Sequence, residues 1–148
     1  MKTKRMAESL VRKFKTRDPF KIAEALGYTV LRVPLKGIRG FYQRIHRCTI
    51  IYIDSALSEW DAAFVCAHEI GHVLLHRGYN RIFMDTNAYF KVDRYEIEAD
   101  QFAVCLRFDD DFIEEFADSP TVVLAYAIGV STELASYRLQ VLDARNPR

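Results

Sequence analysis

Several classes of protein are disfavoured by what this 148-residue chain lacks. Its three cysteines are an odd number without C-x-x-C spacing, so we expect neither a disulfide scaffold nor a cysteine-based zinc knuckle, and a reducing cytoplasm is the expected compartment. No apolar run is long enough to span a bilayer, and the basic N-terminus lacks the apolar stretch of a secretory signal. Lys and Arg number 21 against 20 Asp and Glu, a balance that argues against a general polyanion binder.

Apolar residues, in contrast, are plentiful enough for one core. Half of the residues are hydrophobic, with ten Phe and eight Tyr, and the length suits one domain. Helical patterns are followed by strand patterns and then by further helices, which predicts the α+β class rather than α/β. We expect a single domain over 1–148, made of a basic helix over 1–17, a core over 18–108 and a helical segment over 109–148.

Caps and β-rich runs predict the individual elements. Asp18-Pro19 indicates a helix start, Gly27 its end, and Ser58 the start of a long helix closed by Arg77 and Gly78. The expected strands are residues 28–33, 41–43 and 48–53, the last two joined by a hairpin at His46-Arg47. The last strand fits the core of a sheet or, alternatively, an edge along which a peptide could lie. After a loop over 79–92, the expected helices are 93–107, 110–116, 121–128 and 132–142.

The first 17 residues carry seven Lys or Arg and a single acid, Glu8. Their apolar residues fall at helical spacing, which predicts an amphipathic helix with a basic face. The simplest interpretation is a solvated face on a helix packed against the domain. A nucleic-acid contact or an arm that docks on an acidic partner are the alternatives.

Residues 68–72 read His-Glu-Ile-Gly-His and match the H-E-x-x-H motif. His68 and His72 are four residues apart, so on a helix their imidazoles lie on one face, about 40° apart. Two nitrogens at that spacing can bind one Zn²⁺. Glu69 points about 100° away, where its carboxylate can hold the attacking water. The alternative is a pair of hydrogen-bonded structural histidines.

A catalytic zinc site normally has three protein ligands, so a third is expected elsewhere. The candidates are Glu96 and Glu98, which lie on either side of their helix's apolar stripe, so periodicity does not choose between them. Asp100 favours Glu96, because it is on the same side and could accept a hydrogen bond from a ligand histidine. We therefore predict Glu96 as the ligand and Asp100 as its support. The alternative for Glu96 is a capping box with Asp93.

This constellation predicts hydrolysis of a peptide bond with one Zn²⁺ per chain and Glu69 as general base. Mn²⁺ or Co²⁺ could also occupy such a site. Side chains that could contact substrate or the oxyanion are available, but the sequence does not choose among His46, Tyr42, Tyr89 and Tyr95. His76, one turn beyond the motif, is predicted to cap the helix or line the cleft rim, with substrate contact as the alternative.

Residues 17–108 resemble the ImmA/IrrE family of zinc metallopeptidases. The similarity rests on an ordered set of segments: Asp18-Pro19-Phe20, Leu26-Gly27, Gly40-Phe41-Tyr42, residues 50–53, residues 67–72 with His76, and Glu96, Glu98-Ala99 and Phe102-Ala103. One departure is that members often have a Leu-Leu-x-Pro-like segment after the glutamate helix, where this chain reads Cys105-Leu106-Arg107-Phe108.

The resemblance implies a minimal zincin-like domain, with a small, mostly antiparallel sheet packed on the active-site helix. It implies zinc bound by His68, His72 and Glu96, with Glu69 catalytic. It also implies a narrow endopeptidase that cleaves a helix-turn-helix repressor and so releases genes of a mobile element, prophage or stress response. The chain ends before the sensor domain of the radiation-response members, so the phage branch is the closer expectation.

The C-terminal segment suggests two competing functions. Residues 108–137 contain seven acids and no Lys or Arg, so the segment could inactivate a repressor by binding it without catalysis. Residues 125–131 have the A-x-x-x-G-x-S spacing of a helix-turn-helix, which would suggest a DNA-binding regulator. The would-be recognition helix offers only Arg138 to phosphates, so direct DNA binding is not expected.

Overall fold

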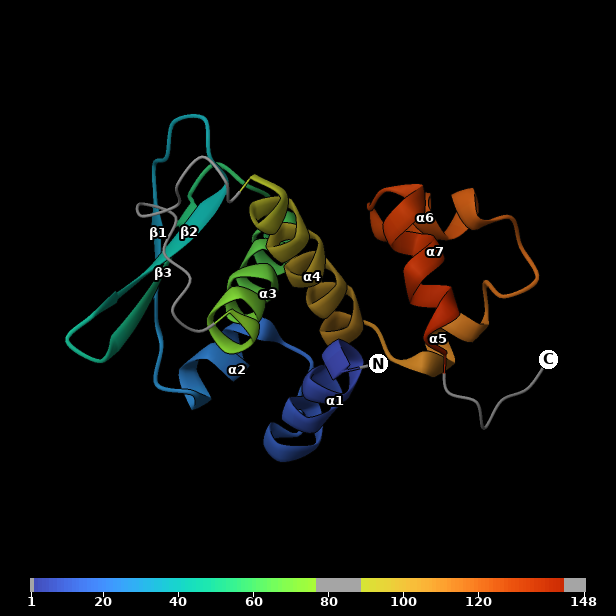
Figure 1. Cartoon of the computed structure of the whole chain (residues 1–148), viewed down its shortest axis with the longest axis horizontal. Helices are drawn as coiled ribbons and strands as arrows, with labels where there is room; N and C mark the ends of the chain where they lie inside the picture. Colours follow the sequence, from blue (N-terminus) through green and yellow to red (C-terminus); the bar gives the residue numbers. More distant parts are fainter. Residues whose placement is uncertain (1, 77–88, 143–148) are drawn as a thin grey trace.

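Two long helices lie side by side at the centre of the fold, with the sheet on one side and the C-terminal helices on the other (Figure 1). The structure is a computed structural model that describes residues 2–76 and 89–142, except the side chains of 89–92. Its helices are α1 (Lys2–Phe14), α2 (Pro19–Ala25), α3 (Glu59–Leu75), α4 (Tyr89–Arg107), α5 (Asp110–Glu114), α6 (Thr121–Ile128) and α7 (Thr132–Gln140). Its strands are β1 (Thr29–Val33), β2 (Gly40–Ile45) and β3 (Cys48–Asp54). The predicted α+β class is confirmed.

The sheet has the order β1-β3-β2, with β1 parallel and β2 antiparallel to β3. It is therefore mixed rather than mostly antiparallel. The hairpin is confirmed at His46 and Arg47, whose φ angles of 50° and 68° give the tight turn between β2 and β3. The alternative that residues 48–53 form a sheet edge is wrong. β3 is the central strand, because it buries Ile51 and Ile53 completely and β1 pairs along its other side.

Helix α3 begins where the sequence predicts. The Ser58 hydroxyl accepts a hydrogen bond from the Asp61 amide, and the acids of the first turn suit the helix dipole. Most of its circumference is buried, so tertiary packing stabilises it. It ends at Leu75 with His76 as its C-cap. The residues predicted to close it, Arg77 and Gly78, lie outside the described part of the chain.

Helix α4 begins four residues earlier than predicted, at Tyr89. The expected loop over 79–92 is thus wrong for residues 89–92, while 79–88 lie outside the described residues. No proline or glycine separates residues 89–92 from the rest, so the helix continues upstream. Asp93 is consequently inside the helix, and the proposed capping box with Glu96 is wrong. The Arg17 guanidinium donates to the carbonyls of Cys105 and Leu106 at the other end of α4.

Helices α1 and α7 both pack on α4. Helix α1 packs against α4 and buries Ala7, as expected of an amphipathic helix. Helices α5 to α7 form where predicted, with α6 and α7 joined by a turn at Gly129, whose φ is 74°. Arg138 of α7 is fully buried, so it cannot contact DNA phosphates in this structure. Among the described residues, no helix has the length and apolar character needed to cross a membrane.

Candidate metal centre

Two glycines let the elements around the site approach closely. A Cβ atom on Gly71, between the motif histidines, would lie 3.0 Å from the Phe102 ring of α4. A Cβ atom on Gly40, at the start of β2, would lie 2.5 Å from Val65 Cγ1 of α3. Real Cβ atoms do not tolerate such contacts without a shift, so glycine at both positions sets how tightly α4 and β2 pack on α3.

The two motif histidines turn their Nε2 atoms toward one carboxylate. The ring centroids of His68 and His72 are 4.6 Å apart and their planes are nearly perpendicular, at 84°. Glu96 Oε2 lies 2.9 Å from His68 Nε2, and Glu96 Oε1 lies 3.0 Å from His72 Nε2. Burial would raise the pKa of Glu96, but the contacts with both imidazoles outweigh it and lower that pKa. The three side chains thus converge through two nitrogens and a carboxylate.

Asp100 holds the other nitrogen of His68. Its Oδ1 lies 2.7 Å from His68 Nδ1, one helical turn beyond Glu96 on α4. Burial alone would lower the pKa of His68, but the hydrogen bonds with Asp100 and Glu96 outweigh it and raise the pKa to about 9. An acceptor at Nδ1 fixes the orientation of the ring and leaves Nε2 for a ligand.

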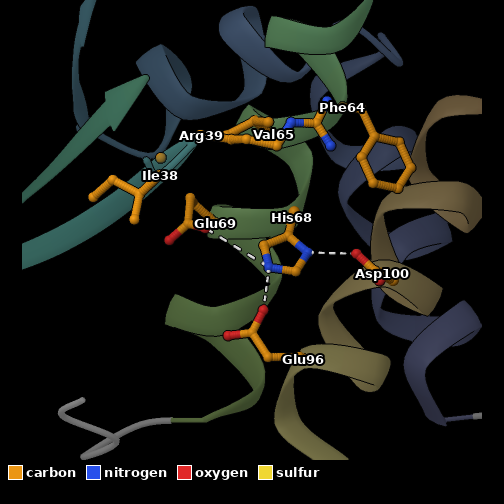
Figure 2. Close-up of a pocket in the computed structure, with 9 residues that line it drawn as sticks. Ile38, Arg39, Phe64, Val65, His68, Glu69, Glu96 and Asp100 are labelled. Atoms are coloured by element: carbon orange, nitrogen blue, oxygen red, sulfur yellow. Dashed lines mark hydrogen bonds and ion pairs between the residues drawn. The ribbon is translucent and has the colours of Figure 1, made fainter. Parts of the chain in front are cut away.

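Glu69 lies beside His68 in the same cleft (Figure 2). Its side chain is 2% exposed, and Oε2 lies 3.8 Å from His68 Nε2. His68, Glu69 and His72 each bring a donor atom within 4.8 Å of the others, so either Glu69 or Glu96 could complete a metal site with the histidines. The cleft has a volume of about 300 Å³. It is also lined by Ile38 and Arg39, which precede β2, and by Phe64 and Val65 of α3.

His76 is buried behind His72 instead of lying at the cleft rim. Its Nδ1 lies 3.2 Å from His72 Nδ1, and its Nε2 lies 3.1 Å from Glu98 Oε2. The ring centroid of Tyr95 is 4.2 Å from that of His76, and the ring centroid of Tyr42 is 6.4 Å from that of His72. Burial would raise the pKa of Glu98, but its bonds to His76 and Arg94 lower it.

The structure therefore brings together the residues predicted from the motif. Asp100 and Glu96 both reach His68, whereas Glu98 turns to His76. Tyr42 lies near His72, and Tyr95 packs against His76. Sequence reasoning missed the contact between His72 and His76, although the i, i+4 spacing of these residues could have suggested it.

Comparison with known proteins identifies the family. The profile of the IrrE N-terminal-like domain, peptidase family M78, matches residues 23–140. The chain belongs to this family. It is also 36% identical over 135 residues to the uncharacterized immunity region protein 2 of Bacillus phage phi105, an alignment that covers 89% of this chain and 85% of that protein. The predicted ImmA/IrrE resemblance is thereby confirmed.

The M78 family consists of metallopeptidases that in general depend on zinc. The donors in this chain suit that metal, because imidazole nitrogens and a carboxylate are the ligands of many catalytic zinc sites. They also converge: Glu96 is within 3.0 Å of both Nε2 atoms. The M78 site of this chain is thus chemically compatible with one zinc ion.

Proposed function

We propose that this M78 protein is a zinc endopeptidase that cleaves a helix-turn-helix repressor. The observation that carries the proposal is the convergence of Glu96 on the Nε2 atoms of both motif histidines. We assign His68, His72 and Glu96 as the zinc ligands. Glu98 is not a ligand in this proposal, because its carboxylate is engaged by His76 and Arg94.

Glu69 is the proposed general base. Its carboxylate is buried in the cleft, on the same helix as both histidines and close to His68 Nε2. It removes a proton from the attacking water and returns it to the leaving amine. When bound, zinc would supply a Lewis acid that polarises the scissile carbonyl and lowers the pKa of water toward 7.

Strand β2 offers a place for an extended substrate. Within the described residues it pairs with β3 on one side only, and its first residue, Gly40, lines the cleft beside His68 and Glu69. A peptide that added to this edge would pass the proposed zinc ligands in an extended conformation. This arrangement favours cleavage within a flexible segment of a protein over cleavage inside a folded helix.

The similarity to a phage immunity region protein supports a repressor as the substrate. The test is to incubate the zinc-loaded protein with helix-turn-helix repressors encoded in the same genome and to measure fragment masses. We expect one repressor to be cut at a defined bond by the wild type and left intact by Glu69→Gln, which should keep the metal. Cleavage by Glu69→Gln at the wild-type rate would contradict the assigned base.

The ligand assignment has its own test. Metal content measured for Glu96→Ala and Glu98→Ala should separate the two glutamates, since both substitutions remove one carboxylate from the same helix. We expect zinc to be lost from the first variant and retained, at reduced affinity, by the second. The opposite pattern would make Glu98 the ligand.

A non-catalytic anti-repressor is the second candidate function. Helix α6 exposes apolar side chains, with Tyr126 92% and Val122 60% exposed, in a segment rich in acids. Such a surface could bind a repressor directly. In a reporter strain, Glu69→Gln would still relieve repression if binding suffices, whereas the protease proposal predicts that repression persists.

A further inference from the structure

A chain of hydrogen bonds runs from the buried His72 toward the surface, on the side opposite Glu96. It passes from His72 Nδ1 to His76 Nδ1 over 3.2 Å, and from His76 Nε2 to Glu98 Oε2 over 3.1 Å. The Arg94 Nε donates to the other oxygen of Glu98 at 2.9 Å. The side chains of His72 and His76 are 0% and 2% exposed, so water does not compete for the contact between the two rings.

We propose that His76 and Glu98 are positioning residues, which fix the tautomer and the orientation of His72 so that its Nε2 can bind metal. This inference rests on the proposed zinc function. Neither residue touches the metal or the substrate in this role. Glu98, predicted from sequence only as a substitute ligand, and His76, predicted as a cap or a rim residue, thus act together behind the ligand.

The direction of the hydrogen bonds follows from the requirement at the metal. A ligand His72 presents the lone pair of Nε2, so its proton resides on Nδ1 and is donated to His76 Nδ1. A neutral His76 that accepts at Nδ1 carries its own proton on Nε2 and donates it to the Glu98 carboxylate. Each donor in the chain therefore meets an acceptor, and Glu98 selects the tautomer of both rings.

The geometry also excludes His76 as a ligand of the same ion. Its Nδ1 contacts His72 Nδ1, the nitrogen of His72 that faces away from Glu96. Its own Nε2 is already bonded to Glu98. A third histidine beside the motif is thus used to orient a ligand and does not add one.

Burial explains why His72 needs this indirect support when His68 does not. Asp100 contacts His68 directly and keeps 43% of its side chain exposed, so its charge remains solvated. The Nδ1 side of His72 faces the interior occupied by His76, so a carboxylate in that place would itself be buried, at a high desolvation cost. His76 relays the interaction outward to Glu98, whose side chain is 28% exposed and paired with Arg94.

The test measures the dissociation constant for Zn²⁺ by competition with a chromophoric chelator, and the d–d absorption of the Co²⁺-loaded protein. His76→Phe keeps an aromatic ring against Tyr95 but removes the hydrogen bonds. His76→Asn loses the ring but keeps an oxygen that can accept from His72 Nδ1. Glu98→Ala removes the end of the chain, and Asp93→Asn removes an exposed carboxylate from the same helix as the matched control.

We expect His76→Phe to weaken zinc binding about 10- to 100-fold and to alter the Co²⁺ spectrum, as loss of a group behind a ligand does. Glu98→Ala should weaken it about tenfold, while His76→Asn should stay nearer to the wild type and Asp93→Asn should match it. A purely structural role for the ring predicts the reverse order, with His76→Phe benign and His76→Asn damaging, and that order would overturn the inference.

Two further outcomes separate this inference from the proposed function. If the wild type binds zinc and cleaves a repressor, but His76→Phe and Glu98→Ala keep its zinc affinity and Co²⁺ spectrum, only the positioning role is overturned. If the wild type binds neither ion, the zinc site itself is wrong and both proposals fall. The thermal unfolding of each metal-free variant identifies any variant that has simply lost its fold, and the remaining variants then decide.

Discussion

Asp110 links helix α1 to helix α7, and its substitution offers a sharp test of the fold. Its carboxylate accepts hydrogen bonds from Lys4 Nζ of α1 and from Arg138 Nη2 of α7, both at 2.8 Å. Lys4 also donates to the Val141 carbonyl, and Arg138 to the Phe108 carbonyl. The two cations are 7% and 0% exposed, and among residues 2–76 and 89–142 Asp110 is the carboxylate that pairs with both of them.

The substitution Asp110→Asn keeps the shape of the side chain and removes its charge. Removal of one partner of a buried ion pair typically costs about 3–5 kcal/mol, because the other charge is left uncompensated. Asp110 keeps 20% of its side chain exposed, so we expect the lower end of that range, about 3 kcal/mol of unfolding free energy. For a chain of this length, that loss corresponds to a fall in Tm of roughly 10 °C.

The pH dependence of stability provides the second readout. Burial would raise the pKa of Asp110, but the hydrogen bonds from Lys4 and Arg138 outweigh it and hold that pKa below its usual value. A carboxyl group with a lowered pKa in the folded state stabilises above its unfolded pKa, near 4. That contribution is lost as pH falls through the folded pKa. The wild type should therefore lose stability in acid more steeply than Asp110→Asn does.

The assay is urea unfolding of both proteins between pH 7 and pH 2, followed by far-UV circular dichroism. Asp111→Asn is the matched control, because it removes an exposed carboxylate from the same turn of α5. We expect it to change stability by no more than about 0.5 kcal/mol. A loss below 1 kcal/mol in Asp110→Asn, or parallel acid profiles for the two proteins, would refute the reasoning.

Three further predictions concern packing, thiols and metal. Gly71→Ala places a methyl group 3.0 Å from the Phe102 ring, so it should cost about 1–3 kcal/mol in urea unfolding and weaken zinc binding by separating α3 from α4. Thiol titration at pH 8 should modify the exposed Cys48 quickly. Cys66 and Cys105 should react slowly, because burial raises the pKa of the Cys66 thiol to about 12 and also raises the pKa of Cys105. Rapid reaction of all three cysteines would contradict the fold. Zinc at 100 times its Kd should stabilise the protein by about 2.7 kcal/mol, and removal of the metal with a chelator should abolish the gain.

Much of the fold follows from local rules that act within a few residues. The predicted caps at Asp18 and Ser58 mark true helix starts, because the side-chain oxygen of each accepts a hydrogen bond from a free amide of the first turn. The boundary of α4 could not be obtained in this way. Asp93 has the character of a cap, but residues 89–92 contain no helix breaker, so the helix passes through it.

The order of the strands in the sheet could not be predicted from the local sequence pattern either. The strand at Cys48–Asp54 has β-rich character that fits either an edge or the centre of a sheet. Its position depends on where β1 pairs, and that pairing joins residues about 20 positions apart in the chain. The central position of β3 therefore emerged only with the tertiary structure.

The sequence by itself determined the family, the α+β class and a helix that carries two histidines on one face, because helical periodicity places residues four apart on the same side. The tertiary structure decided what surrounds that face. Glu96 and Glu98 flank the same stripe of α4, and only the packing of α4 on α3 sends one to the Nε2 atoms and the other to His76. Such a choice depends on the relative position of two helices, which no local pattern in either helix encodes.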